Sequence, residues 1–268
     1  MSEIRYVTLD PTGNITCLVT AMPPDADEAA VTRRLMRECE QVAYLEAPAQ
    51  PGARAHIRLM GGEFCGNAAM ASACYLADRD GILPGQEVIL PIEMSGASGI
   101  LACEVRRFAG SFEGTVPMPP VQSIAPLQAE GLPLTAVAME GIAHLILSGP
   151  PFPDDAQAEA LLRRLAGTRP EEAVGLLLWD EGSLTMRPLV LVKGSGTLVW
   201  ETGCGSGSAA VGAYRAFRAG RGVTRTDVRQ PGGVITVSAT VRDSLPEYLT
   251  ITGRVRLGPE KTIAAELP

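Results

Sequence analysis

Two cysteines in this sequence each stand at the start of a run of small residues. Cys65 opens the segment CGNAAMASA and Cys204 opens the segment CGSGSAA, each with a glycine directly after it. Such a glycine lets the backbone turn tightly, and Asn67 and Ser206 then follow as good N-cap residues. The pattern predicts two helices that each begin beside a cysteine.

A helix N-terminus gives a neighbouring cysteine two chemical advantages. Its unpaired N–H groups and positive dipole end favour a bound carboxylate, and they lower the pKa of a thiol from about 8.5 toward neutrality. We therefore expect Cys65 and Cys204 to act as base and acid on opposite faces of an amino-acid α-carbon, which inverts its configuration. Backbone donors aimed at the enediolate oxygens would offset part of the cost of the carbanion, at roughly 3–4 kcal/mol for each well-placed donor.

This chemistry needs no electron-sink cofactor, and we expect none. The only lysines are Lys193 and Lys261, and neither lies in a recognisable pyridoxal-phosphate motif. His56 and His144 lie far from any cysteine cluster with zinc spacing, so we also expect no metal. The remaining cysteines are expected to be buried apolar residues: Cys17, Cys39, Cys74 and Cys103.

The two cysteine segments are related beyond the cysteines themselves. From Cys65 to Gly81, seven of seventeen positions are identical to those from Cys204 to Gly220. Low complexity could supply the shared alanines, but not a shared cysteine, tyrosine, arginine and glycine in register. The sequence therefore predicts an internal duplication, with two α+β halves that each carry one cysteine corner.

Composition and charge exclude several other classes of protein. The chain has 268 residues, 46% of them hydrophobic, and a net charge of -7 without a basic run, which disfavours nucleic acid and membrane surfaces as partners. The first residues lack the basic and apolar regions of a signal peptide, and no apolar run reaches spanning length. We expect a cytoplasmic protein with free thiols and a small-molecule partner; a homodimer stays open.

The order of expected elements repeats between the two halves. Val116–Val121 holds three prolines in six residues, which suits a crossing between domains, so we expect an N-terminal half over 1–117 and a C-terminal half over 118–268. Residues from about 259 to 268 are expected to pack back on the first half. Helices are expected over 25–42, after Cys65, over 153–167 and after Cys204, and strands over 6–10, 14–20, 53–60, 87–94, 99–108, 141–147, 173–180, 187–194, 197–201, 232–242 and 248–258.

The two cysteine segments resemble the signature segments of diaminopimelate epimerase and its cofactor-independent amino-acid racemase relatives. Further likenesses cover nearly the whole chain: PTGNITCLV, ECEQVAYLE, GIAHLIL and QPGGVITV. The resemblance implies an α+β fold of two pseudo-symmetric halves, each a β-sheet curled round a central helix. It also implies a PLP-independent isomerase with two catalytic cysteines, Cys65 and Cys204.

The resemblance further implies a set of substrate-binding residues. The backbone at Gly66, Asn67, Gly205 and Ser206 would hold the α-carboxylate. Asn14 would lie near the substrate, and Gln41, with Glu40 as its rival, would lie near the reacting amine. His144 stands in the place of the family's histidine, and Glu201 is a further polar candidate beside Cys204.

This sequence also departs from the diaminopimelate epimerase pattern. The asparagine of the Asn-Pro-His segment is replaced by Ile142, and no Glu-Arg pair precedes Cys204. A site that binds a second carboxylate and amine would lose much of its affinity for them without those partners, so diaminopimelate is an unsuitable substrate. The far pocket is expected to be more apolar, with Trp200 as a candidate wall and with His56 and Arg58 as polar candidates.

Several functions remain in competition at this point. The segment WETGCGSGS resembles the histidine racemase branch, which favours histidine or another amino acid other than diaminopimelate. A proline or hydroxyproline epimerase and an isomerase of the phenazine pathway are alternatives on the same fold. A redox-responsive thiol protein, with a reversible disulfide between Cys65 and Cys204, is the alternative that is not an enzyme.

Overall fold

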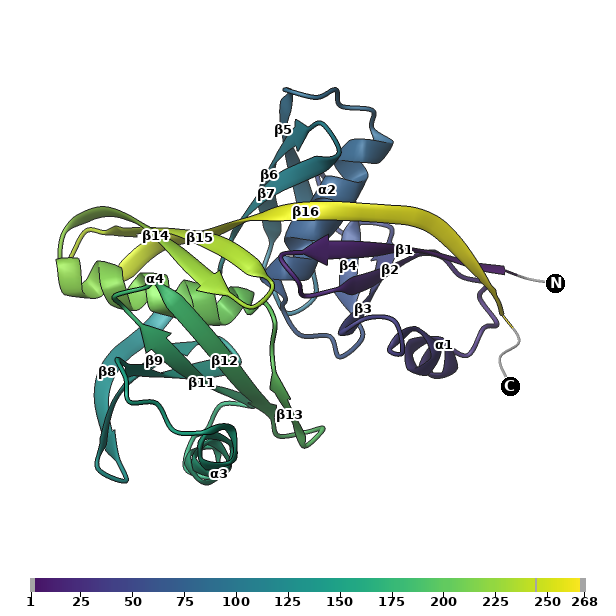
Figure 1. Cartoon of the computed structure of the whole chain (residues 1–268). Coiled ribbons are helices and arrows are strands. Elements are labelled where there is room, and N and C mark those ends of the chain that lie inside the picture. The colour runs from purple at the N-terminus through teal and green to yellow at the C-terminus, as the bar shows by residue number, and fades with distance from the viewer. Residues whose placement is uncertain (1–2, 244, 266–268) are drawn as a thin grey trace. The chain divides into compact units, whose positions relative to one another are not determined.

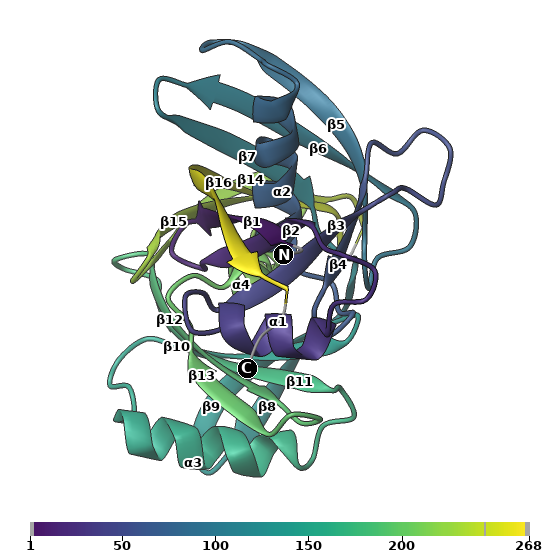
Figure 2. The same cartoon turned by 90° about the vertical axis from the view of Figure 1, so that its right-hand side faces the viewer.

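The chain groups into two compact units, which the computed structural model describes over residues 3–243 and 245–265. The N-terminal unit runs to Pro117 and takes in the chain again from Thr252. The C-terminal unit runs from Met118 to Ile251. Figures 1 and 2 show both units, coloured along the chain.

The N-terminal unit is built from strands and two helices, with the second helix at its centre. Its elements are β1 (Glu3–Pro11), β2 (Thr16–Ala21), α1 (Glu28–Leu35), β3 (Gln41–Glu46), β4 (His56–Leu59), α2 (Gly66–Arg79), β5 (Glu87–Met94), β6 (Ile100–Phe108), β7 (Ser111–Pro117) and the second part of β16 (Pro246–Ala264).

The strands of this unit pair in a closed series. Neighbours follow the order β1 to β7, and β16 pairs with both β7 and β1. The pairs β2–β3 and β4–β5 are parallel, because α1 and α2 carry the chain back to the starting edge between them. Helix α2 contacts strands β1, β2 and β4 to β7 (Figure 2), so it forms the core around which the strands curl.

The C-terminal unit has a comparable set of elements. They are β8 (Val121–Ala129), β9 (Leu132–Met139), β10 (Ile142–Ser148), α3 (Asp155–Ala166), β11 (Ala173–Asp180), β12 (Thr185–Val192), β13 (Thr197–Trp200), α4 (Gly205–Ala219), β14 (Gly222–Gln230), β15 (Gly233–Val241) and the first part of β16. The strand order is β16, β15, β14, β12, β11, β10, β9, β8, with β13 paired to β12.

The two units follow the same topology. The series β1, β2, α1, β3, β4, α2, β5, β6, β7 corresponds to β9, β10, α3, β11, β12, α4, β14, β15, β16. The parallel pairs recur at the corresponding places, β10–β11 after α3 and β12–β14 after α4. The fold is therefore α+β with two pseudo-symmetric halves, each curled round a central helix, as expected from the repeated cysteine segments.

Small residues let the central helices lie close to their strands. Twelve of the fourteen residues of α2 are buried. A Cβ added at Gly114 of β7 would stand 2.5 Å from the Met70 side chain of α2, and one added at Gly212 of α4 would stand 2.3 Å from Val237 of β15. The run of alanines, glycines and serines after each cysteine is thus explained by tight packing inside a curled sheet.

Some expected elements differ in the structure. The helix expected over 25–42 covers Glu28–Leu35, because the backbone N–H groups of Glu40 and Gln41 bond to the carbonyl of Ile15 and draw the following residues into strand β3 beside β2. Strands β3, β7, β8, β9 and β14 were not expected from the sequence. In the part of the chain described here, no helix is long and apolar enough to cross a membrane.

Candidate active site

Cys65 lies at the junction between β4 and α2. It is the N-cap residue of α2, with extended backbone angles, and its sulfur accepts the backbone N–H of Ala68 at 3.5 Å. The expectation that Asn67 caps this helix is wrong, because the cysteine sulfur itself takes the first-turn N–H that an N-cap side chain satisfies. Cys65 is partly exposed, whereas Asn67 is buried in the first turn.

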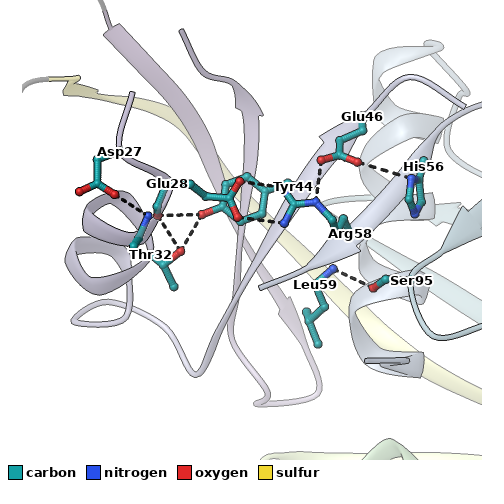
Figure 3. A network of polar contacts seen from close by, with 10 residues as sticks. Asp27, Glu28, Thr32, Tyr44, Glu46, His56, Arg58, Leu59 and Ser95 are labelled. Carbon is teal, nitrogen blue, oxygen red and sulfur yellow. Dashed lines mark hydrogen bonds and ion pairs between the residues drawn. The ribbon is translucent and has the colours of Figure 1, made fainter. Parts of the chain in front are cut away.

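Ser95 and Gly96, which directly follow β5, contact the segment before Cys65. The Ser95 hydroxyl accepts the backbone N–H of Leu59 at 2.9 Å (Figure 3). The same hydroxyl donates to the carbonyl of Glu63, also at 2.9 Å. Gly96 has a φ of +70°, and a Cβ there would stand 2.2 Å from the backbone nitrogen of Phe64. These contacts fix the backbone that delivers Cys65 to the helix.

Asn14, Glu40 and Gln41 form one hydrogen-bonded cluster in the N-terminal unit. The Gln41 side-chain nitrogen donates to Asn14 Oδ1 and to Thr16 Oγ1, both at 2.8 Å, and Asn14 Nδ2 donates to Glu40 Oε2 at 2.7 Å. Asn14 and Gln41 are buried. The structure therefore brings together both candidates for the reacting amine, Gln41 and its rival Glu40, through the same asparagine.

Cys204 occupies the corresponding corner of the C-terminal unit, after β13. It is the N-cap of α4, and its sulfur accepts the backbone N–H of Gly207 at 3.2 Å. Its sulfur also lies 3.6 Å from Ser206 Oγ. Ser206 was expected as the N-cap, but like Asn67 it is the second residue of its helix. Both units therefore cap their central helix with a cysteine.

A buried glutamine secures the Cys204 backbone. Gln230, at the end of β14, accepts the backbone N–H of Cys204 at 2.7 Å and donates to Ser208 Oγ at 2.8 Å. Ser208 in turn donates to the carbonyl of Cys204 at 2.7 Å. The segment QPGGVITV was part of the sequence resemblance, but Gln230 was not predicted as a site residue. The signal for it was its place as a polar residue directly before Pro-Gly-Gly.

The protonation of Cys204 is governed by burial. Loss of hydration raises the pKa of this thiol well above its usual value, and the carboxylate of Glu201 raises the same pKa further. Hydrogen bonds from Ser206 and Gly207 act in the opposite direction. The expectation of a pKa lowered toward neutrality is therefore wrong for Cys204, because complete burial outweighs the donors of the helix N-terminus.

His144 lies on β10 and is fully buried. Its Nε2 is 3.0 Å from Ser206 Oγ, so the structure links two of the candidates that the resemblance implied. Burial lowers the pKa of His144 to about 3, and the imidazole is neutral at physiological pH.

Three other polar or aromatic candidates are accounted for by packing and ion pairs. Figure 3 shows Arg58 bonded to both oxygens of Glu28 at 2.9 and 2.8 Å and to Glu46 at 2.7 Å, with its guanidinium over Tyr44. His56 lies 3.5 Å from the same Glu46. Trp200 packs against the core beside α3 and donates to Glu159 at 3.2 Å.

The chemistry available at the two corners is that of thiols and backbone N–H groups. None of the six cysteines takes part in a disulfide, and each carries a thiol. Within residues 3–243 and 245–265, no group of three or more His, Cys, Asp or Glu side chains is arranged to hold a metal ion. The sulfur at each helix start can exchange a proton with a bound carbon acid. The first-turn amides beside it can bind a carboxylate.

Comparison with known proteins gives one family and one fold. Residues 3–263 match the family model described as the histidine racemase CntK N-terminal domain. A histidine racemase from Staphylococcus aureus is 27% identical over 263 residues, which cover 94% of each chain. A histidine racemase from Fusobacterium nucleatum is 29% identical over 239 residues, or 86% of each chain.

Solved structures support the same architecture at lower sequence identity. A hydroxyproline epimerase from Agrobacterium vitis matches with a TM-score of 0.71 and 16% identity, over 100% of this chain and 95% of that chain. At this identity the likeness concerns the fold alone. The family model covers nearly the whole sequence, and both curated relatives agree with it, so this chain belongs to the histidine racemase family that the CntK N-terminal domain model describes.

Proposed function

We propose that this protein is a cofactor-independent histidine racemase that uses Cys65 and Cys204 as its two bases. Its family and both curated relatives support an amino-acid racemase. The observation that carries the proposal is the repeated corner: each unit caps its central helix with a cysteine whose sulfur accepts a first-turn amide. Packing alone gives no reason for a thiol at both equivalent places.

The helix starts also supply groups that suit the α-carboxylate of the substrate. The amides of Ala68 and Gly207 are directed to the two sulfurs, and the backbone at the two helix starts, at Gly66, Asn67, Gly205 and Ser206, would bind the carboxylate. Such donors stabilise the enediolate that forms when the α-proton leaves, at roughly 3–4 kcal/mol for one well-placed donor.

The reaction at the α-carbon consists of two proton transfers. One sulfur, as thiolate, takes the α-proton, so that a C–H bond breaks and an S–H bond forms. The other sulfur, as thiol, gives its proton to the opposite face of the carbanion, and histidine is released with inverted configuration. Glu201, whose carboxylate interacts with Cys204, would take up and return the proton of that thiol. The Asn14, Glu40 and Gln41 cluster would bind the amino group.

A deuterium exchange assay tests this function directly. L-Histidine is incubated with the protein in deuterated buffer with reductant and without added cofactor, and loss of the α-hydrogen signal is followed by NMR together with chiral analysis of the product. We expect exchange coupled to formation of D-histidine. Cys65→Ser and Cys204→Ser should each lower racemisation by roughly 10³-fold or more.

Serine is a suitable substitute because it is itself a good N-cap residue, so both variants should keep their helices. Cys74→Ala, in α2 but away from its start, is the matched control and should retain activity within about twofold. No exchange on histidine would reject the histidine assignment. Exchange on L-proline or trans-4-hydroxy-L-proline instead would favour the epimerase alternative.

A redox role makes a different prediction for the same two residues. A reversible disulfide between Cys65 and Cys204 under mild oxidant, without exchange on any amino acid, would favour the thiol-switch alternative. We place the racemase in the cytoplasm, where free thiols stay reduced. A homodimer is a separate expectation, which sedimentation analysis would test.

A further inference from the structure

Three side chains of the C-terminal unit form a row that ends at the sulfur of Cys204. His144 Nε2 lies 3.0 Å from Ser206 Oγ, and Ser206 Oγ lies 3.6 Å from Cys204 Sγ. His144 comes from β10, and the other two residues come from the start of α4. The proton positions along this row decide what it does to the thiol.

The protonation state of His144 follows from its surroundings. With its pKa lowered to about 3 by burial, the ring is neutral and one nitrogen carries the hydrogen. Nδ1 is buried and has no hydrogen-bond partner among the described residues. Because a buried N–H without an acceptor is rarer and costlier than an unused acceptor, the hydrogen belongs on Nε2. His144 therefore donates to Ser206.

This direction fixes the hydroxyl hydrogen of Ser206. An oxygen that accepts from His144 Nε2 is free to turn its own hydrogen toward Cys204, and 3.6 Å is within hydrogen-bonding range for a sulfur acceptor. The sulfur also accepts the N–H of Gly207 at 3.2 Å. The Cys204 sulfur thus faces two donors, and the charged group that acts on it is the carboxylate of Glu201.

We propose that His144 is a positioning residue, which orients the Ser206 hydroxyl as a donor to the Cys204 thiolate. The inference rests on the proposed function and deepens it, because it assigns the Ser206 hydroxyl to the sulfur and leaves the Ser206 backbone for the substrate. His144 acts through Ser206 as a neutral hydrogen-bond donor and exchanges no proton with the substrate.

The test measures how readily each sulfur is deprotonated, without any substrate. Methyl methanethiosulfonate reacts with a thiolate to give a methyl disulfide and methanesulfinate, so its rate at fixed pH follows the thiolate fraction. Peptide mapping by mass spectrometry reports Cys204 and Cys65 separately in one sample, and Cys65 serves as the internal control.

Ser206→Ala and His144→Leu should each slow modification of Cys204 by roughly tenfold or more, with Cys65 unchanged within about twofold, as expected for loss of a hydrogen bond to a charged group. The double variant should be no slower than either single variant, because both changes remove the same donor. His144→Gln, which keeps an N–H near the place of Nε2, should restore most of the rate.

Three results of the modification assay would overturn the inference. They are an unchanged or faster Cys204 rate in Ser206→Ala, additive losses in the double variant, and a His144→Gln protein as slow as His144→Leu. Racemisation of histidine gives a second readout: kcat should fall in Ser206→Ala while KM stays within about twofold, and a rise confined to KM would instead place the hydroxyl on the substrate. If the unmodified protein fails to racemise any amino acid, the proposed function fails, while the sulfur rates still decide this inference.

Discussion

Gly175 lies so close to the imidazole of His144 that a Cβ at position 175 would stand 2.3 Å from Nδ1. The two residues are paired in register on the parallel strands β10 and β11. The ring occupies the space that a side chain at 175 would need, and Nε2 points away from it to Ser206. The glycine thus determines where the histidine can stand.

Gly175→Ala should therefore displace His144. Overpacking of a buried site costs about 1–3 kcal/mol of unfolding free energy, and urea denaturation would measure this loss. The double variant Gly175→Ala, His144→Ala should lose less than the sum of the single variants, since the small residue at 144 makes room. Gly167→Ala, at the αR C-cap of α3 where the added Cβ meets only ordinary contact, is the control.

The burial of His144 predicts a loss of stability in acid. The pKa of His144 is about 3 in the folded protein and about 6.5 in the unfolded chain. Below pH 6.5 the unfolded chain therefore binds a proton at this residue that the folded protein does not bind. Stability is fully present above pH 6.5 and falls by about 1.4 kcal/mol per pH unit toward pH 3. Urea denaturation at pH 7 and pH 5 measures how much unfolding free energy is lost between the two. This loss should be smaller by about 2 kcal/mol in His144→Gln than in the unmodified protein. Parallel losses in both proteins would contradict the assignment.

Gln230→Leu should weaken the Cys204 corner. It leaves the backbone N–H of Cys204 and the hydroxyl of Ser208 without their present partner, and an unsatisfied buried group costs about 1–3 kcal/mol. Chemical denaturation should show this loss, and racemisation should fall with it. Gln128→Leu, on the exposed face of β8, should change stability by less than about 0.5 kcal/mol.

Gly212→Ala tests the close packing of α4. In an exposed helix this change would stabilise the protein by about 1 kcal/mol, but here the new Cβ would stand 2.6 Å from Val237 Cβ, which cannot swing aside. We expect a net loss of about 1–3 kcal/mol. Thermal unfolding should show partial recovery when Val237→Ala is added, and an increase in Tm for Gly212→Ala alone would contradict the packing argument.

The sequence predicted the duplicated α+β fold because its strongest signals are local. The Cys-Gly corners and the small-residue helices after them recur at equivalent places, and the family match agrees with them. Strands β8 and β9 were missed since prolines interrupt their patterns, with Pro126 inside β8 and Pro133 inside β9. The end of α1 was missed because a contact distant in sequence, from Ile15 to Gln41, draws the chain into β3.

The position of the two cysteines in the fold was predicted better than their electrostatics. The sequence indicated cysteines at two helix starts, and the structure places them there as the N-caps themselves. The pKa of Cys204 is raised, whereas a lowered pKa was expected, because the degree of burial of a side chain depends on the whole unit around it. Gln230 and Gly175 were missed for the same reason: each matters through a partner far along the chain.

Strand β16 spans nineteen residues and divides its length between the two units. Its last part pairs with β1, where Glu3 stands opposite Ala264. The N-terminal unit therefore contains strand pairs between residues that lie very far apart in the sequence, and such contacts form slowly. During translation, the strand edges of β1 and β7 that β16 covers stay unpaired until the segment after Thr252 leaves the ribosome, so these edges can pair with other chains for longer than the rest of the unit.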